Sequence, residues 1–140
     1  MGNVVIQNPP QYTEQIPKWD RETLADGEAM GQVIEQLANN DAYLKKELER
    51  QEHVELITLT AAGWQGSGPY TQAVEASGVQ DTDEPMAKEV IPKGTTKEDE
   101  KAIRKAAGCV SYFETGNGTV TFTCIGKKPE TDFQVVMKGV

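Results

Sequence analysis

Apolar residues recur at steps of four, three, seven and four residues between Met30 and Leu48, and this heptad-like repeat constrains the fold more than any other feature of the chain. The run GQVIEQLANNDAYLKKELERQE, residues 31–52, places its large apolar side chains on one narrow stripe of a helix. Such a stripe cannot be buried by one helix alone, so it predicts packing against other helices, most simply further copies of the same chain. We call this stripe the seam, and its apolar members are Met30, Ile34, Leu37, Leu44 and Leu48.

A strict heptad also places Asp41 in the seam, in line with Ile34 and Leu48. A polar residue at such a position lowers stability but can fix the register and the number of helices. We therefore expect the cluster of Asn39, Asn40 and Asp41 to define the oligomer, either a trimer or a dimer. The alternative is that the helix packs for a few turns on another element. Because the seam covers only about three heptads, the rest of the chain must contribute to assembly.

Residues 1–23 predict an extended arm, because three prolines remove backbone donors and interrupt helix formation. The arm also carries Tyr12, Ile16 and Trp19, which have no secondary-structure period. We expect these side chains to lie along a neighbouring chain or another protein, and a disordered terminus is the alternative. The long helix is predicted to begin near Thr23 to Asp26, with Asp26 as its cap. The helical stalk is assigned to residues 24–53.

From residue 54 the apolar period changes to two, which predicts a β-rich head over residues 54–140. A capped helix is expected at residues 97–107, between the third and fourth strands. Asn117-Gly118 predicts a tight hairpin turn. The expected fold class is α+β: an extended arm, a long oligomeric helix, and a small antiparallel sheet or β-sandwich with one covering helix. The expected strands are residues 54–61, 70–76, 86–91, 110–114, 119–125 and 131–138, and the inward side chains of the last two are Val120, Phe122, Cys124, Phe133, Val135 and Met137.

Composition argues against several function classes. The formal net charge is -8 and no basic cluster interrupts the acidic background, which disfavours nucleic-acid binding. No stretch is long and apolar enough to span a bilayer, and the N-terminus does not resemble a signal peptide. The single histidine, His53, has no nucleophile near it in sequence, so we expect no enzymatic activity, and we also expect no metal or other cofactor.

Two cysteines, Cys109 and Cys124, each lie in a β-like run. Buried, unpaired thiols are the favoured interpretation, and a disulfide is possible if the two strands are neighbours. Trp64 and Tyr70 flank a glycine-rich loop, where exposed aromatic side chains would form a surface for sugar or protein contact. The favoured alternative is that both side chains point inward and pack in the head.

Three segments carry a resemblance to a known group of proteins. The segment YTEQIPKWDRETLADGEAMGQVIEQLANNDAYLKKELE resembles the N-terminal part of small virion structural proteins of bacteriophages and prophages of Firmicutes. The segments LTAAGWQGSGPYTQAVEASGV and GTVTFTC resemble a head module found at the C-terminus of phage tail and fibre-like proteins. The matches extend from Tyr12 to Cys124, and the helix at residues 97–107 departs from the compact form of that module.

The resemblance implies a homotrimeric or otherwise multimeric appendage of the virion, assembled in the bacterial host cytoplasm. The arm would dock onto another virion protein through Tyr12, Ile16, Pro17 and Trp19, which match the motif of the group. The head would face outward and contact the host surface, as part of a tail or baseplate fibre. A capsid head fibre or decoration protein, or a cell-wall glycan-binding module that uses Trp64 and Tyr70, are the alternatives. Unpaired thiols agree with assembly in the cytoplasm.

Overall fold

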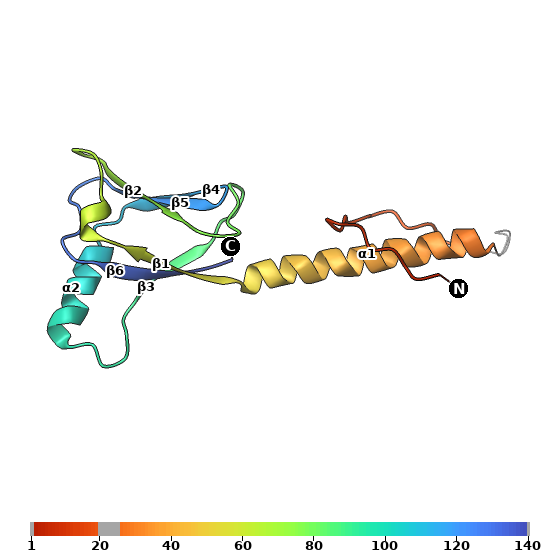
Figure 1. Ribbon diagram of the computed structural model, residues 1–140, viewed down its shortest axis with the longest axis horizontal. Helices are drawn as coiled ribbons and strands as arrows, with labels where there is room; N and C mark the ends of the chain where they lie inside the picture. Colours follow the sequence, from red (N-terminus) through yellow and green to blue (C-terminus); the bar gives the residue numbers. More distant parts are fainter. Residues whose placement is uncertain (1, 20–25, 140) are drawn as a thin grey trace. The chain divides into compact units, whose positions relative to one another are not determined.

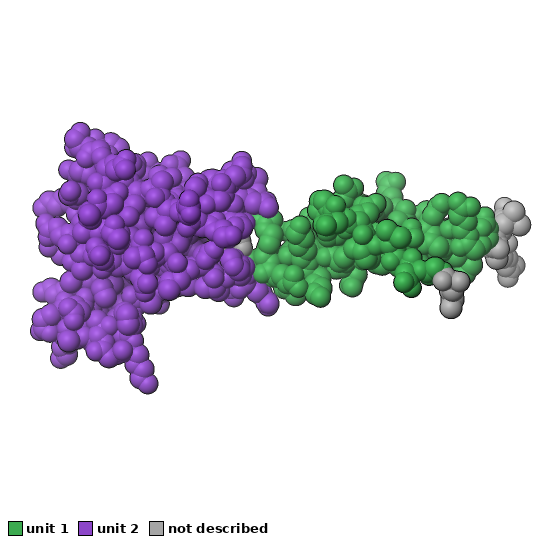
Figure 2. All heavy atoms as spheres, viewed as in Figure 1, with its two compact units in different colours: residues 1–50 green, residues 51–140 purple. Residues whose placement is uncertain are grey.

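The computed structural model describes residues 2–19 and 26–139, and the chain divides into two compact units. The first comprises residues 1–50 and the second residues 51–140 (Figure 2). We call them the stalk unit and the head unit. The predicted α+β class is confirmed, because two helices accompany two antiparallel three-stranded sheets (Figure 1).

The stalk unit is built on one long helix, α1, which spans Gly27–Glu52. Asp26 caps it as predicted: the carboxylate oxygen Oδ1 accepts a hydrogen bond from the backbone N–H of Glu28 at 2.7 Å, and the Asp26 carbonyl accepts one from Met30 at 3.0 Å. The predicted helix start at Thr23 lies outside the described residues. Beside α1 runs the arm, residues 2–19, which contains no helix or strand (Figure 1).

The head unit contains two antiparallel sheets of three strands each, and the central strand of each sheet comes from the last third of the chain. In one sheet the order is β1-β6-β3, and in the other it is β2-β5-β4. All six strands begin and end within a few residues of their predicted limits. Their bounds are β1 Val54–Leu59, β2 Tyr70–Glu75, β3 Met86–Val90, β4 Tyr112–Gly116, β5 Thr119–Cys124 and β6 Phe133–Lys138.

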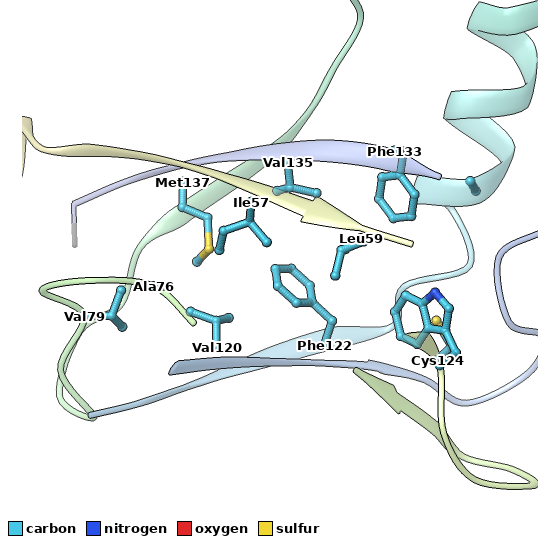
Figure 3. Packing of buried hydrophobic residues seen from close by; sticks show 12 residues of the cluster. Ile57, Leu59, Ala76, Val79, Val120, Phe122, Cys124, Phe133, Val135 and Met137 are labelled. Atoms are coloured by element: carbon cyan, nitrogen blue, oxygen red, sulfur yellow. The ribbon is translucent and has the colours of Figure 1, made fainter. Parts of the chain in front are cut away.

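The core of the head lies between the two sheets (Figure 3). Alternate residues of β5 and β6 point into it, as the period of two predicted. Trp64, which follows the short 3₁₀ helix Ala61–Gly63, and Val79 add to the same cluster. The head is therefore a small β-sandwich with one continuous core. Its buried apolar members are Ile57, Leu59, Trp64, Ala76, Val79, Ala106, Val120, Phe122, Cys124, Phe133, Val135 and Met137.

Helix α2 spans Lys97–Ala107, the range predicted from the sequence. Thr96 caps it, because its hydroxyl oxygen accepts a hydrogen bond from the Asp99 N–H at 3.1 Å. Ala106 is buried, and α2 contacts β3 and β6 near Phe133 (Figure 3). The helix therefore packs at the end of the sandwich where β6 begins, whereas the sequence had suggested a helix lying across a sheet. Arg104 connects α2 to β3 through a 3.0 Å ion pair with Glu89.

The β4–β5 hairpin turns at Asn117-Gly118, as predicted, and the positive φ of +77° falls on Gly118. Gly118 donates its N–H to the carbonyl of Val79 at 2.8 Å and accepts the N–H of Ala76 at 3.0 Å. These two bonds attach the hairpin turn to the segment that follows β2. The turn thus joins two parts of the head that are about forty residues apart in sequence.

Candidate oligomerisation and attachment site

The five apolar seam residues are exposed to solvent on α1. Between 42% and 56% of each side chain's surface is accessible in Met30, Ile34, Leu37, Leu44 and Leu48. Isolated exposed apolar side chains are common on proteins, but five at heptad spacing form a continuous stripe. Asp41, the polar member of the seam, is exposed as well. All members of the predicted seam are therefore accessible to solvent in the single chain.

Asn39 is the only residue of α1 that is buried, with 7% of its surface accessible. Its Oδ1 accepts the backbone N–H of Gln7 at 2.7 Å, and its Nδ2 donates to the backbone carbonyl of Val5 at 3.3 Å and to that of Glu35 at 2.8 Å. The amide thus pairs with two backbone groups of the arm as a neighbouring β-strand would.

Asn40 makes the same kind of contact with a second part of the arm. Its Oδ1 accepts the N–H of Thr13 at 2.7 Å, and its Nδ2 donates to the carbonyl of the same residue at 2.8 Å. Gln7 and Thr13 are thus held by adjacent helix residues, which requires the arm to reverse direction between them. Asn39 and Asn40 were expected, with Asp41, to specify the oligomer. In the single chain their amide groups bind the arm, a contact that the sequence did not predict, and a role of this cluster in the oligomer stays a prediction.

The two asparagines lie at different positions around α1 relative to the seam. Successive residues of a helix are rotated by about 100°, so Asn39 lies about half a turn away from Ile34 and Leu37, whereas Asn40 lies only about 40° from Leu44. The limb of the arm at Thr13 therefore flanks one edge of the seam, and the seam residues themselves stay exposed. This arrangement could not be read from the periodicity, since the asparagines pair with backbone groups more than 25 residues away.

The four predicted attachment residues of the arm differ in their surroundings. Tyr12 packs against Tyr43 of α1, with ring centroids 5.7 Å apart and planes tilted by 50°. Tyr12, Pro17 and Trp19 remain exposed, and Ile16 is half-buried. Residues 5–13 bind their own helix, which the sequence did not predict, and docking of the arm on another chain stays a prediction. Tyr12, Pro17 and Trp19 nevertheless retain accessible surface.

The arm also exposes a segment that the sequence reading did not single out. Val4, Val5 and Ile6 are three successive β-branched residues, and each leaves 43–66% of its surface accessible. Their β-branched character is the signal that could have identified them, because such residues favour extended backbone. They enlarge the apolar surface that the arm presents.

The head does not expose the aromatic pair that the sequence suggested as a ligand surface. Trp64 leaves only 5% of its surface accessible and lies in the core, and Tyr70 is half-buried against the same core. The interpretation of Trp64 as a sugar-stacking residue is therefore wrong, because an indole buried between sheets offers no face to a ligand. The favoured inward packing of both residues agrees with these positions.

Both cysteines are free thiols in the head, which agrees with the favoured interpretation from the sequence. Cys124 is fully buried in the core and Cys109 is half-buried beside it. Burial, followed by the neighbouring Cys109, raises the pKa of Cys124 from 9.0 to about 11. The Cys124 thiol is therefore protonated at neutral pH and has little nucleophilic character.

The head has a mainly apolar cleft of about 270 Å³ beside β3 and β4. Its lining includes Ala87, Val110, Phe113 and Phe133. Within residues 2–19 and 26–139, no group of three or more His, Cys, Asp or Glu side chains is arranged to hold a metal ion. Over the same residues, neither helix combines the length and apolar character needed to cross a bilayer.

Comparison of the chain with protein-family models, with curated proteins and with solved structures gives no match.

Proposed function

We propose that this chain is a non-enzymatic structural protein of a bacteriophage or prophage virion. In this proposal it forms a homo-oligomer, most simply a trimer, through the seam of α1. The product is a fibre or a tail or baseplate appendage that is attached by its arm. The observation that carries the proposal is the five-residue apolar seam left exposed on a helix whose other face is already covered.

Burial of the seam would supply a substantial free energy of association. Full burial of a large apolar side chain contributes about 1.5–3 kcal/mol, and these side chains are about half exposed, so each contributes roughly 1 kcal/mol per subunit. A trimer would bury fifteen such side chains. This gain opposes the loss of translational and rotational freedom on association, which costs at least several kcal/mol.

The assignment to a virion rests on the resemblance of the arm, the helix and the head segments to phage structural proteins. The chain contains, in this order, an arm, a helix with an exposed seam and a β-sandwich. This order suits an appendage that is present in many copies on a virion. In this proposal the exposed Tyr12, Pro17 and Trp19 bind a neighbouring virion protein. Placement on the tail or baseplate is the leading form, and placement on the capsid is the second.

Analytical ultracentrifugation of the full chain tests the oligomer. We expect a homo-oligomer at micromolar concentration, and we expect Leu44→Lys to weaken it at least tenfold because a charge enters the apolar seam. Gln32→Lys is the matched control, because it adds the same charge at an exposed position of α1 outside the seam. A monomeric wild-type chain, or equal effects of the two variants, would contradict assembly through the seam.

Immunogold labelling tests the virion assignment. Antibodies raised against the purified chain are applied to particles from the host strain, before and after removal of the tails. Label on the tail tip or baseplate supports the leading form, and label on the head supports the capsid form. Particles that contain the protein in neither place would overturn the assignment.

A further inference from the structure

The outer face of the β1-β6-β3 sheet carries a second exposed apolar surface. Strand alternation directs Ile57 and Leu59 into the core, so Val54 and Leu56 of the same strand point outward. These two residues leave 51% and 55% of their surface accessible. Met86 of β3, on the same outer face, is accessible over 77% of its surface.

The strand register places Leu56 and Val136 side by side, and lysines separate them from Met86. Leu56 is paired with Val136 of β6, and Val136 is paired in turn with Lys88 of β3. In the next row, Lys138 lies between Val54 and Met86. The apolar side chains of β1 and β6 are therefore direct cross-strand neighbours. We call the set of Val54, Leu56, Met86 and Val136 the outer patch.

Two lysines border the outer patch, so contact between copies requires their like charges to stay in solvent. Among its cross-strand neighbours the charged residues are Lys88 and Lys138, and no carboxylate occurs at the nine outward positions of the three strands. A lysine can lay its methylene stem along an apolar contact and keep its ammonium group in water. The surface is therefore compatible with an interface whose centre is apolar and whose edge is solvated.

The outer face of the other sheet is different. Its outward positions are Thr71, Ala73 and Glu75 in β2, Thr119, Thr121 and Thr123 in β5, and Tyr112 and Glu114 in β4. Thr123 is buried, and Tyr112, with 47% of its surface accessible, is the large apolar residue exposed at these positions. This face therefore offers less apolar surface to a partner than the outer patch. Substitutions on the outer face of the β1-β6-β3 sheet therefore test the outer patch as an interface, and matched substitutions on the outer face of the other sheet serve as controls.

Chain connectivity indicates what covers the outer patch. A single residue, His53, separates the end of α1 from the start of β1. Leu48 of the seam and Val54 of the patch are six residues apart, so their backbones cannot be more than roughly 20 Å apart. In a parallel oligomer joined through the seam, every copy of β1 must therefore begin within roughly 20 Å of a seam contact.

We infer that the outer patch is a head-to-head interface between copies of this chain, continuing the interface made by the seam. This inference rests on the proposed assembly through α1 and adds the head as its second contact. It accounts for the two exposed apolar side chains of β1, the first strand after the helix. It also supplies the additional contact that a seam of about three heptads requires.

Cysteine cross-linking of the full chain tests the inference. Leu56→Cys is compared with Ala73→Cys, which is exposed on the outer face of the other sheet. Both are made with Cys109→Ser, so that the half-buried native thiol does not react. Under mild copper-catalysed oxidation we expect covalent dimers on a non-reducing gel for Leu56→Cys, at least tenfold more than for Ala73→Cys.

A second measurement does not depend on thiol geometry. Leu56→Arg should weaken the oligomer at least tenfold in sedimentation experiments, and Ala73→Arg should leave it unchanged. Circular dichroism verifies that both variants keep the head folded. If the wild-type chain is oligomeric but neither Leu56 variant differs from its Ala73 control, the head interface is wrong and assembly through the seam stands. A monomeric wild-type chain would overturn both.

Discussion

The side-chain amide of Asn40 hydrogen-bonds to both backbone groups of Thr13, with distances of 2.7 and 2.8 Å. Asn39 makes the equivalent pair of bonds to Gln7 and Val5. Two neighbouring asparagines therefore hold both limbs of the arm on one turn of α1. The arm that they bind covers part of α1, and the seam residues of the same helix stay accessible to solvent.

Asn40→Ala should release the second limb of the arm. Each of the two lost hydrogen bonds contributes about 0.5–1.5 kcal/mol, so docking of this limb should weaken by about 1–3 kcal/mol. Hydrogen exchange followed by NMR should show at least tenfold faster exchange of the Thr13 amide. Gln32→Ala, at an exposed position of α1, is the control and should leave that amide unchanged. Unchanged protection of Thr13 in Asn40→Ala would contradict the proposed role of this bond.

Asp41→Leu should strengthen the oligomer. Asp41 is the charged residue between Leu37 and Leu44 in the seam, so assembly would bring like charges together at a desolvated position. We expect at least a tenfold gain in association, measured by sedimentation equilibrium, and Asp41→Asn should give a smaller gain. Gln32→Leu adds the same side chain outside the seam, and an equal gain for that variant would indicate nonspecific association.

Trp64→Ala should destabilise the head severely. The indole fills the core between the sheets, and deletion of a buried aromatic side chain costs about 3–5 kcal/mol. Trp64→Phe keeps an aromatic ring and should cost much less. Thermal unfolding followed by circular dichroism distinguishes the two variants. A folded Trp64→Ala head with wild-type stability would show that the indole does not support the core.

Alkaline pH should destabilise the head through Cys124. Its pKa is about 11 in the folded chain and 9.0 for the unperturbed thiol, so the unfolded state loses this proton first as the pH rises. The stabilisation by the neutral buried thiol is therefore complete below pH 9 and is lost between pH 9 and about 11. Each pKa unit corresponds to about 1.4 kcal/mol.

Cys124→Ala is the control for this pH dependence, because it removes the titrating group while keeping a small apolar side chain. Urea unfolding of both proteins at several pH values from 8 to 11 measures the difference. The wild type should lose more stability than Cys124→Ala across this range. Parallel curves would show that the Cys124 thiol does not contribute.

The elements of the head were largely predictable because each follows a local rule. The alternation through Val120, Phe122 and Cys124 gave both the strand and its buried face. Thr96 and the acidic first turn gave the start of α2. The packing of α2 at the end of the sandwich was not predictable, since it depends on contacts with β3 and β6 that are distant in sequence.

The candidate site was predictable only in part, for the same reason. Heptad spacing identified the seam, because a helix determines which side chains share a face. The bonds from Asn39 and Asn40 to the arm were not predictable, because an asparagine amide can pair with any backbone segment that reaches it. The position of the Trp64 side chain was not determined by the sequence, because a glycine-rich loop can direct an aromatic side chain either into the core or into solvent.

The asparagine-bound arm also bears on how a chain of this kind would assemble. The arm of each chain binds the α1 of the same chain, so no second copy is needed to hold the arm in place. Under the proposed assembly, subunits could therefore associate through the seam without first exchanging or unfolding their arms.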